Sequence, residues 1–94
     1  MPYMLIRHKV KDYAIWKPVY DEHNATRKDA GSKGARIFRK ASDPDEIIIL
    51  FEWDSLDNAK KFAKSEDLKK RMQEAGVSDQ PDIYFLEQIE QSSA

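Results

Sequence analysis

The sequence contains no cysteine, and its N-terminus has no apolar stretch long enough for export or for membrane spanning. The missing cysteine excludes disulfides, thiolate metal ligands and cysteine nucleophiles. A transmembrane helix needs about 20 mostly apolar residues, so we expect no membrane partner. Without an export signal, a cytoplasmic location is the expectation.

The chain also lacks an excess of either charge. Sixteen basic and seventeen acidic residues give a net charge of -1, which offers no general attraction for a phosphate backbone or an anionic membrane. RNA-recognition motifs read bases with aromatics on one strand, but the mainly aliphatic stretch from Glu46 to Trp53 lacks that pattern. We therefore expect no nucleic-acid partner.

Length and composition set the scale of the fold. With 94 residues, of which 40% are hydrophobic and 35% charged, we expect a single domain over residues 1–94 with a small core and a strongly solvated surface. A small core favours stabilisation by a partner subunit.

Four stretches are predicted as β-strands. Residues alternate between two faces from Tyr3 to Val10, and apolar residues occupy both faces from Glu46 to Trp53; the other two strands are expected from Gly34 to Ala41 and from Asp82 to Glu90. Turn residues at positions 42–45 join the second and third strands as a hairpin. Residues 91–94 are expected to be a frayed polar tail.

The stretches between the first and second strands and between the third and fourth strands have the residue spacing of helices. Asp12 is a suitable N-cap for a helix that ends near Gly31, and Pro18 predicts either a separate first turn or a kink. Ser55 caps a second helical region, which we expect to divide at Ser65 and to end at Gly76.

The order strand, helix, hairpin, helix, strand predicts an α+β, ferredoxin-like βαββαβ fold with a four-stranded antiparallel sheet. On the third strand, Ile47, Ile49, Phe51 and Trp53 share one face, while Ile48 and Leu50 share the other. Helices can cover only one face, and a second copy of the sheet is the simplest cover for the other. We therefore predict a homodimer formed through the sheet face.

His8 and His23 are the candidate catalytic residues. Each shares a face with apolar or aromatic residues, so both imidazoles are expected between helix and sheet, where a neutral ring could accept a proton. The alternative is that each is a buried histidine bonded to the backbone or to Tyr20. Two histidines without cysteine do not make a metal site, and none is expected.

Several aromatic residues and one arginine are candidates for substrate binding. The aromatic ones would line a cleft for a flat organic ligand, although all of them also suit a plain core. The arginine could bind a carboxylate or phenolate, or lie on the surface at the helix end. These residues are Trp16, Tyr20, Arg27, Phe38 and Trp53.

Four stretches carry a family resemblance over nearly the whole chain: residues 8–13 (HKVKDY), 16–18 (WKP), 51–56 (FEWDSL) and 84–87 (YFLE). The chain resembles dimeric α+β barrel proteins related to the antibiotic biosynthesis monooxygenase superfamily, including cyclase-like members. The resemblance implies a homodimeric barrel of two sheets, with a pocket between sheet and helices in each subunit. It also implies chemistry without flavin or metal, so no cofactor is expected.

In such cofactor-independent oxygenases the pocket helps to deprotonate a phenol or enol, whose anion passes an electron to dioxygen. By resemblance, His8 or His23 would be the base, Arg27 or Tyr20 would steady the oxyanion, and Trp16 and Trp53 would hold the ring. Ile6 stands about where the haem-degrading branch has a strand asparagine, which argues against haem degradation.

The sequence thus predicts a cofactor-independent monooxygenase or cyclase-like enzyme acting on a small aromatic or polyketide-like compound. The alternative is a non-catalytic dimer that binds a small hydrophobic ligand or has a structural, stress-related role.

Overall fold

A computed structural model describes residues 1–94. Four strands and four helices follow one another along the chain: β1 (Pro2–Lys9), α1 (Tyr13–Glu22), α2 (Asn24–Ala30), β2 (Ser32–Lys40), β3 (Asp43–Trp53), α3 (Leu56–Ala63), α4 (Glu66–Glu74) and β4 (Asp82–Glu87). None of the helices combines the length and apolarity that crossing a bilayer would require.

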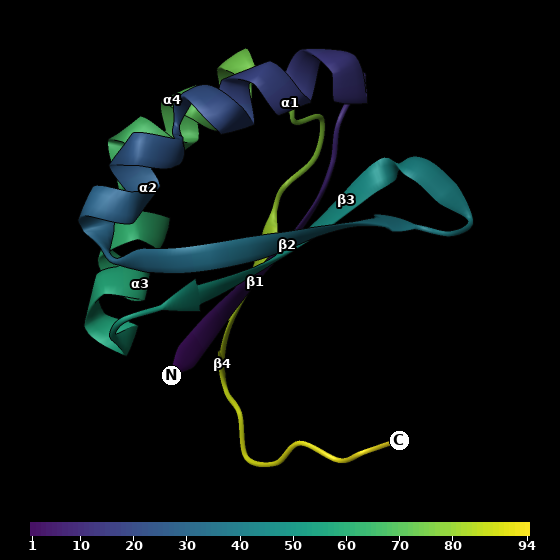
Figure 1. Cartoon of the computed structure of the whole chain (residues 1–94). Coiled ribbons are helices and arrows are strands. Elements are labelled where there is room, and N and C mark those ends of the chain that lie inside the picture. Colours follow the sequence, from purple (N-terminus) through teal and green to yellow (C-terminus); the bar gives the residue numbers. More distant parts are fainter.

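The strands form one antiparallel sheet in the order β2-β3-β1-β4. Each crossover between sheet strands consists of two short helices, and the helical layer covers one side of the sheet (Figure 1). This arrangement confirms the predicted α+β, ferredoxin-like βαββαβ fold.

Three side chains begin helices where the sequence predicted N-caps. The Asp12 carboxylate accepts from the backbone N–H of Ala14 at 2.9 Å. The Ser55 and Ser65 hydroxyls each accept from the third residue beyond them, both at 3.1 Å. Each cap satisfies an N–H that has no partner inside its helix. The predicted division of the second helical region at Ser65 is confirmed.

The first helical region divides at a different point from the one predicted. Helix α1 continues through Pro18, and the interruption falls at His23, which ends α1 and precedes α2. Proline has no backbone N–H, so Pro18 cannot donate the helical hydrogen bond to the Ala14 carbonyl. Ala14 and Pro18 are both exposed, so water can hydrate that carbonyl and the helix tolerates the loss.

Two strand ends differ from the prediction by three residues, and the other strand ends differ by two or fewer. Strand β3 begins at Asp43 because Asp43 pairs with Lys40, which leaves only residues 41 and 42 for the turn. Strand β4 ends at Glu87 rather than Glu90, because Glu87 pairs with Pro2 and β1 offers no residue beyond it. Residues 88–94 form neither helix nor strand and lead away from the sheet on the side opposite the helices (Figure 1).

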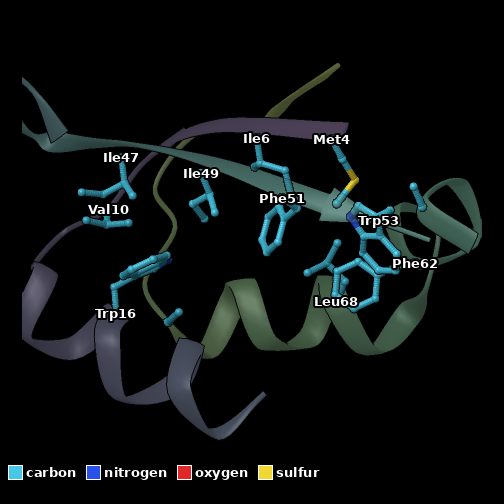
Figure 2. Packing of buried hydrophobic residues seen from close by; sticks show 12 residues of the cluster. Met4, Ile6, Val10, Trp16, Ile47, Ile49, Phe51, Trp53, Phe62 and Leu68 are labelled. Carbon is cyan, nitrogen blue, oxygen red and sulfur yellow. The ribbon is translucent and has the colours of Figure 1, made fainter. Parts of the chain in front are cut away.

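The core lies between the sheet and the helices. Alternation along β1 and β3 directs every second side chain into this layer, where helix residues meet them. Figure 2 shows Trp16 from α1 at one end, on the side of Val10 and Ile47, and Trp53 with Phe62 at the other. Twelve buried hydrophobic residues make up the cluster: Met4, Ile6, Val10, Trp16, Ile47, Ile49, Phe51, Trp53, Ala59, Phe62, Leu68 and Ala75.

The opposite face of the sheet has no cover within the chain. Its central residues are Leu5, Ile48 and Leu50, and the cross-strand pair Leu5 and Leu50 places two leucines side by side. Phe38 pairs with Ile48 and Tyr84 pairs with Leu5 on this same face. We call this surface the outer sheet face; it consists of Leu5, Phe38, Ile48, Leu50, Tyr84 and Leu86, all partly or largely exposed.

Gly31 joins α2 to β2 with a φ of 121°, a backbone conformation that side chains disfavour. A β-carbon at this position would also collide with the Asp54 carboxylate. Gly31→Ala should therefore reduce the free energy of unfolding by about 1–3 kcal/mol. Urea unfolding measures the change, with Ser32→Ala as a neighbouring control that should stay within about 0.5 kcal/mol. Equal stability of the Gly31→Ala variant and the parent chain would contradict this account of the junction.

Candidate functional site

A cavity of about 40 Å³ lies between the sheet and the helices. Its volume has room for roughly three water molecules. Ten of its fourteen lining residues are hydrophobic. The lining consists of Ile6, His8, Trp16, Val19, Tyr20, His23, Arg27, Ile49, Phe51, Phe62, Leu68, Arg71, Met72 and Ala75.

His8 supplies an unpaired polar group in this cavity. It is 2% exposed, because its place on β1 puts it in the helix-facing series with Ile6 and Val10. Neither Nδ1 nor Nε2 has a hydrogen-bond partner within the chain. Burial lowers the pKa of His8 from 6.5 to about 4, so the ring is neutral at pH 7. A neutral imidazole carries one donor and one acceptor, and neither is satisfied within the chain.

Two aromatic rings from successive turns of α1 form one wall. Trp16 and Tyr20 stack with centroids 4.9 Å apart and an interplanar angle of 24°. The imidazole of His8 lies beside Trp16, with centroids 5.8 Å apart. Their spacing of four residues places both rings on the same side of the helix.

Arg27 is buried at the other end of this wall. It is 5% exposed, and its guanidinium carbon lies 3.7 Å from the centroid of the Tyr20 ring. Nη1 donates to the Tyr20 carbonyl at 2.8 Å, and Nη2 makes only a long contact of 3.5 Å with Asn24 Oδ1. Burial lowers the pKa of Arg27 and raises that of Tyr20.

His23 differs from His8 because it has a carboxylate partner. Its Nε2 lies 2.6 Å from Oδ2 of Asp67 in the first turn of α4, and the ring is buried while Asp67 is about half exposed. The contact links the junction of α1 and α2 to α4. It also fixes the orientation of the ring, which borders the cavity.

Two of the residues predicted to bind substrate lie outside the cavity. Phe38 is on the outer sheet face and 50% exposed, because it pairs with Ile48; its neighbour Ile37 takes the helix-facing position. Trp53 is fully buried against Phe62, with centroids 5.2 Å apart, and serves the core. Its indole N–H has no partner in the chain. The structure therefore places His8, Trp16, Tyr20, His23 and Arg27 around one cavity and excludes the other two.

Sequence reasoning missed the contribution of α4. Leu68, Arg71 and Met72 line the cavity, and Asp67 holds His23. Leu68 and Met72 stand four residues apart, a spacing that places them on one side of the helix but does not distinguish a cavity lining from a core. The pairing of Asp67 with His23 joins residues 44 positions apart, and no local pattern records such a contact. No three histidine or acidic side chains converge where a metal ion could bind.

The titration of His8 tests its environment. With a folded pKa of about 4 against the ordinary 6.5, the unfolded chain takes up the proton first as the pH falls. His8 therefore contributes stability above pH 6.5 that is lost progressively toward pH 4. Between pH 7.5 and pH 5 the parent chain should lose about 2 kcal/mol of unfolding free energy through His8, and a His8→Phe variant should not. The unfolding free energy of the variant minus that of the parent should therefore be about 2 kcal/mol more favourable at pH 5 than at pH 7.5. Urea unfolding at both pH values measures this difference, and an NMR titration giving a His8 pKa near 6.5 would contradict it.

The structure resembles several solved structures at low sequence identity. A Bordetella bronchiseptica protein provisionally named an antibiotic biosynthesis monooxygenase has a TM-score of 0.79 at 15% identity, covering 94% of this chain and 96% of that one. SnoaB, a cofactor-independent oxygenase from Streptomyces nogalater, has a TM-score of 0.78 at 10% identity, covering 99% and 97%. A Caulobacter crescentus CB15 protein with the same provisional name has a TM-score of 0.74 at 18% identity, covering 95% and 90%.

No protein-family model matches the sequence, and no curated protein matches it significantly. In these comparisons the structural likeness covers nearly the whole length of both chains. This chain therefore has the fold of the antibiotic biosynthesis monooxygenase structures.

Proposed function

We propose that the protein is a cofactor-independent monooxygenase that acts on a small aromatic or polyketide-like compound bound in the cavity between sheet and helices. The observation that carries the proposal is His8, a buried neutral imidazole whose two nitrogens have no partner in the chain. Buried polar groups in proteins are almost always hydrogen-bonded, so a group left unpaired in a cavity points to something that binds there.

His8 would accept a proton from a phenol or enol of the substrate. A pKa of about 4 makes the ring by itself a weak base. An anion forming beside the ring raises that pKa, because a nearby negative charge favours the imidazolium. Proton transfer and oxyanion formation thus support each other.

The substrate anion would supply the electrons that dioxygen requires. When a CH₂ group becomes a carbonyl, one oxygen atom enters the substrate and the other leaves as water, so atoms and electrons balance without a further reductant. Trp16 and Tyr20 offer a flat wall to the ring, and Arg27 at the other end of this wall supplies a cation for an acidic group of the substrate. The likeness in fold to SnoaB supports this reaction class.

Oxygen consumption with a panel of electron-rich phenols and anthrones tests the proposal. We expect His8→Phe to lower kcat by about a hundredfold or more, because loss of a general base typically has that effect. Ile15→Leu keeps an apolar side chain at an exposed position of α1 outside the cavity lining and should leave turnover unchanged. Full turnover by the His8→Phe variant would remove His8 from the mechanism.

The size of the cavity favours a second candidate, a non-catalytic protein that binds a small ligand or has a structural, stress-related role. Pockets for drug-sized molecules measure about 300–1,000 Å³, whereas this cavity measures about 40 Å³. An aromatic substrate would have to displace flexible lining side chains such as Met72 and Leu68. Binding of panel compounds without any oxygen consumption would favour this second candidate.

We also propose that the working form is a homodimer joined through the outer sheet face. The apolar residues at the centre of this face have no cover in the chain, and exposed apolar patches of this kind mark interaction sites. Two arginines border these residues on the same face: Arg7, opposite Ile48, contacts Glu46, Asp79 and Asp82 at 3.3, 3.1 and 2.7 Å, and Arg36, opposite Leu50, is exposed and forms no ion pair within the chain. A second copy would therefore meet a surface with apolar residues at its centre and arginines beside them, one of which is paired within the chain.

Leu50→Lys should dissociate this dimer, because it places a charge at the middle of the apolar face. Size-exclusion chromatography with light scattering should give twice the chain mass for the parent protein and a single chain mass for the variant. Ile15→Lys makes the same change at an exposed residue of α1 and should remain dimeric. A parent protein that is monomeric at micromolar concentration would refute the proposed interface.

A further inference from the structure

Arg27 is a buried cation without a counter-ion. No aspartate or glutamate carboxylate lies within 4.0 Å of its guanidinium, whose contacts are the Tyr20 carbonyl and ring and a long contact with Asn24. The nearby Asp21 instead pairs with Lys17. An arginine stays protonated in proteins, and burying its charge is costly unless an anion compensates.

The rest of the cavity offers no negative charge. None of the fourteen lining residues is an aspartate or glutamate, and Arg71 adds a second cation whose partner, Glu74, lies outside the lining. The carboxylate of Asp67 is already engaged with His23. A cavity with apolar walls and cations alone has a positive potential that favours an anionic occupant.

A surface hollow next to the cavity provides a route to Arg27. It lies between α2 and β2, has a volume of about 610 Å³, and shares two lining residues, Tyr20 and Arg27, with the cavity. Lys28 and Lys33 also line the hollow, against a single acidic residue, Asp29. The stacked Tyr20 and Arg27 side chains therefore border both the basic surface hollow and the cavity.

We propose that the ligand is a small aromatic acid, which enters through the hollow between α2 and β2 and binds with its carboxylate or phenolate on Arg27. Its ring lies against Trp16 and Phe51, and a hydroxyl at its far end reaches His8. Movement of the Tyr20 ring opens the passage and enlarges the cavity, and the anion then provides the counter-ion that Arg27 lacks. This inference rests on the ligand site of the proposed function and adds the charge of the ligand and its entrance.

Isothermal titration with 4-hydroxybenzoate and its neutral counterpart 4-hydroxybenzamide tests the inference. The two compounds share a ring and a phenol, so their difference reports the carboxylate. We expect the acid to bind about ten- to a hundredfold more tightly, because hydrogen bonds to charged groups are stronger than neutral ones. NMR shifts of the His8 ring and the Trp16 indole locate both compounds.

Arg27→Met should remove the preference for the acid, and Arg71→Met should leave most of it. Arg27→Lys keeps the charge but loses the planar fork, so a reduced preference is expected. Thermal unfolding confirms that each variant folds, and replacement of an unpaired buried charge by Met is expected to preserve or raise stability.

The outcomes separate the inference from the proposed function. Equal binding of the acid and the amide, with shifts at His8 and Trp16, would overturn the inference and leave the ligand site standing. A preference for the acid that survives Arg27→Met would overturn the role of Arg27. If neither compound shifts His8 or Trp16 at millimolar concentration, both the inference and the proposed ligand site fail.

Discussion

The strict alternation of side chains along β1 and β3 is the constraint on which the rest of the structure depends. It sends Ile6 and His8 from β1, and Ile49 and Phe51 from β3, into the layer between sheet and helices. The same alternation sends Leu5 and Leu50 to the opposite face, where nothing in the chain covers them. A histidine in an apolar layer and an uncovered apolar sheet face are thus two results of one pattern. The first supports a ligand site and the second supports a partner subunit.

The polar groups of the layer complement one another. His8 is neutral and has no hydrogen-bond partner, whereas Arg27 is charged and has no counter-ion. The stacked pair Trp16 and Tyr20 lies between them, so the two groups approach the cavity from different ends of an aromatic wall. An acid with an apolar ring would satisfy both groups at once. His23 is different, because its contact with Asp67 already gives it a role in holding α4 against the junction of α1 and α2.

The sequence predicted the features that depend on local pattern. Alternation identified the strands, and Asp12, Ser55 and Ser65 identified helix starts, because each cap acts within three residues of itself. The helix break was placed wrongly at Pro18, since sequence alone does not show that the carbonyl freed by a proline is exposed to water. The same periodicity that placed His8 in the layer should have excluded Phe38, whose partner Ile48 lies on the outer sheet face. The contact of His23 with Asp67 and the burial of Arg27 without a counter-ion depend on how distant segments pack, and local pattern carries no signal for either.

A crystal structure of the protein grown with 4-hydroxybenzoate would test the central claim, that the layer between sheet and helices is a ligand site, most directly. The account predicts density for the ring against Trp16 and Phe51, the carboxylate on Arg27, the phenol oxygen within hydrogen-bond distance of His8, and a displaced Tyr20 ring. A closed layer without ligand, in which His8 still has no partner, would contradict it.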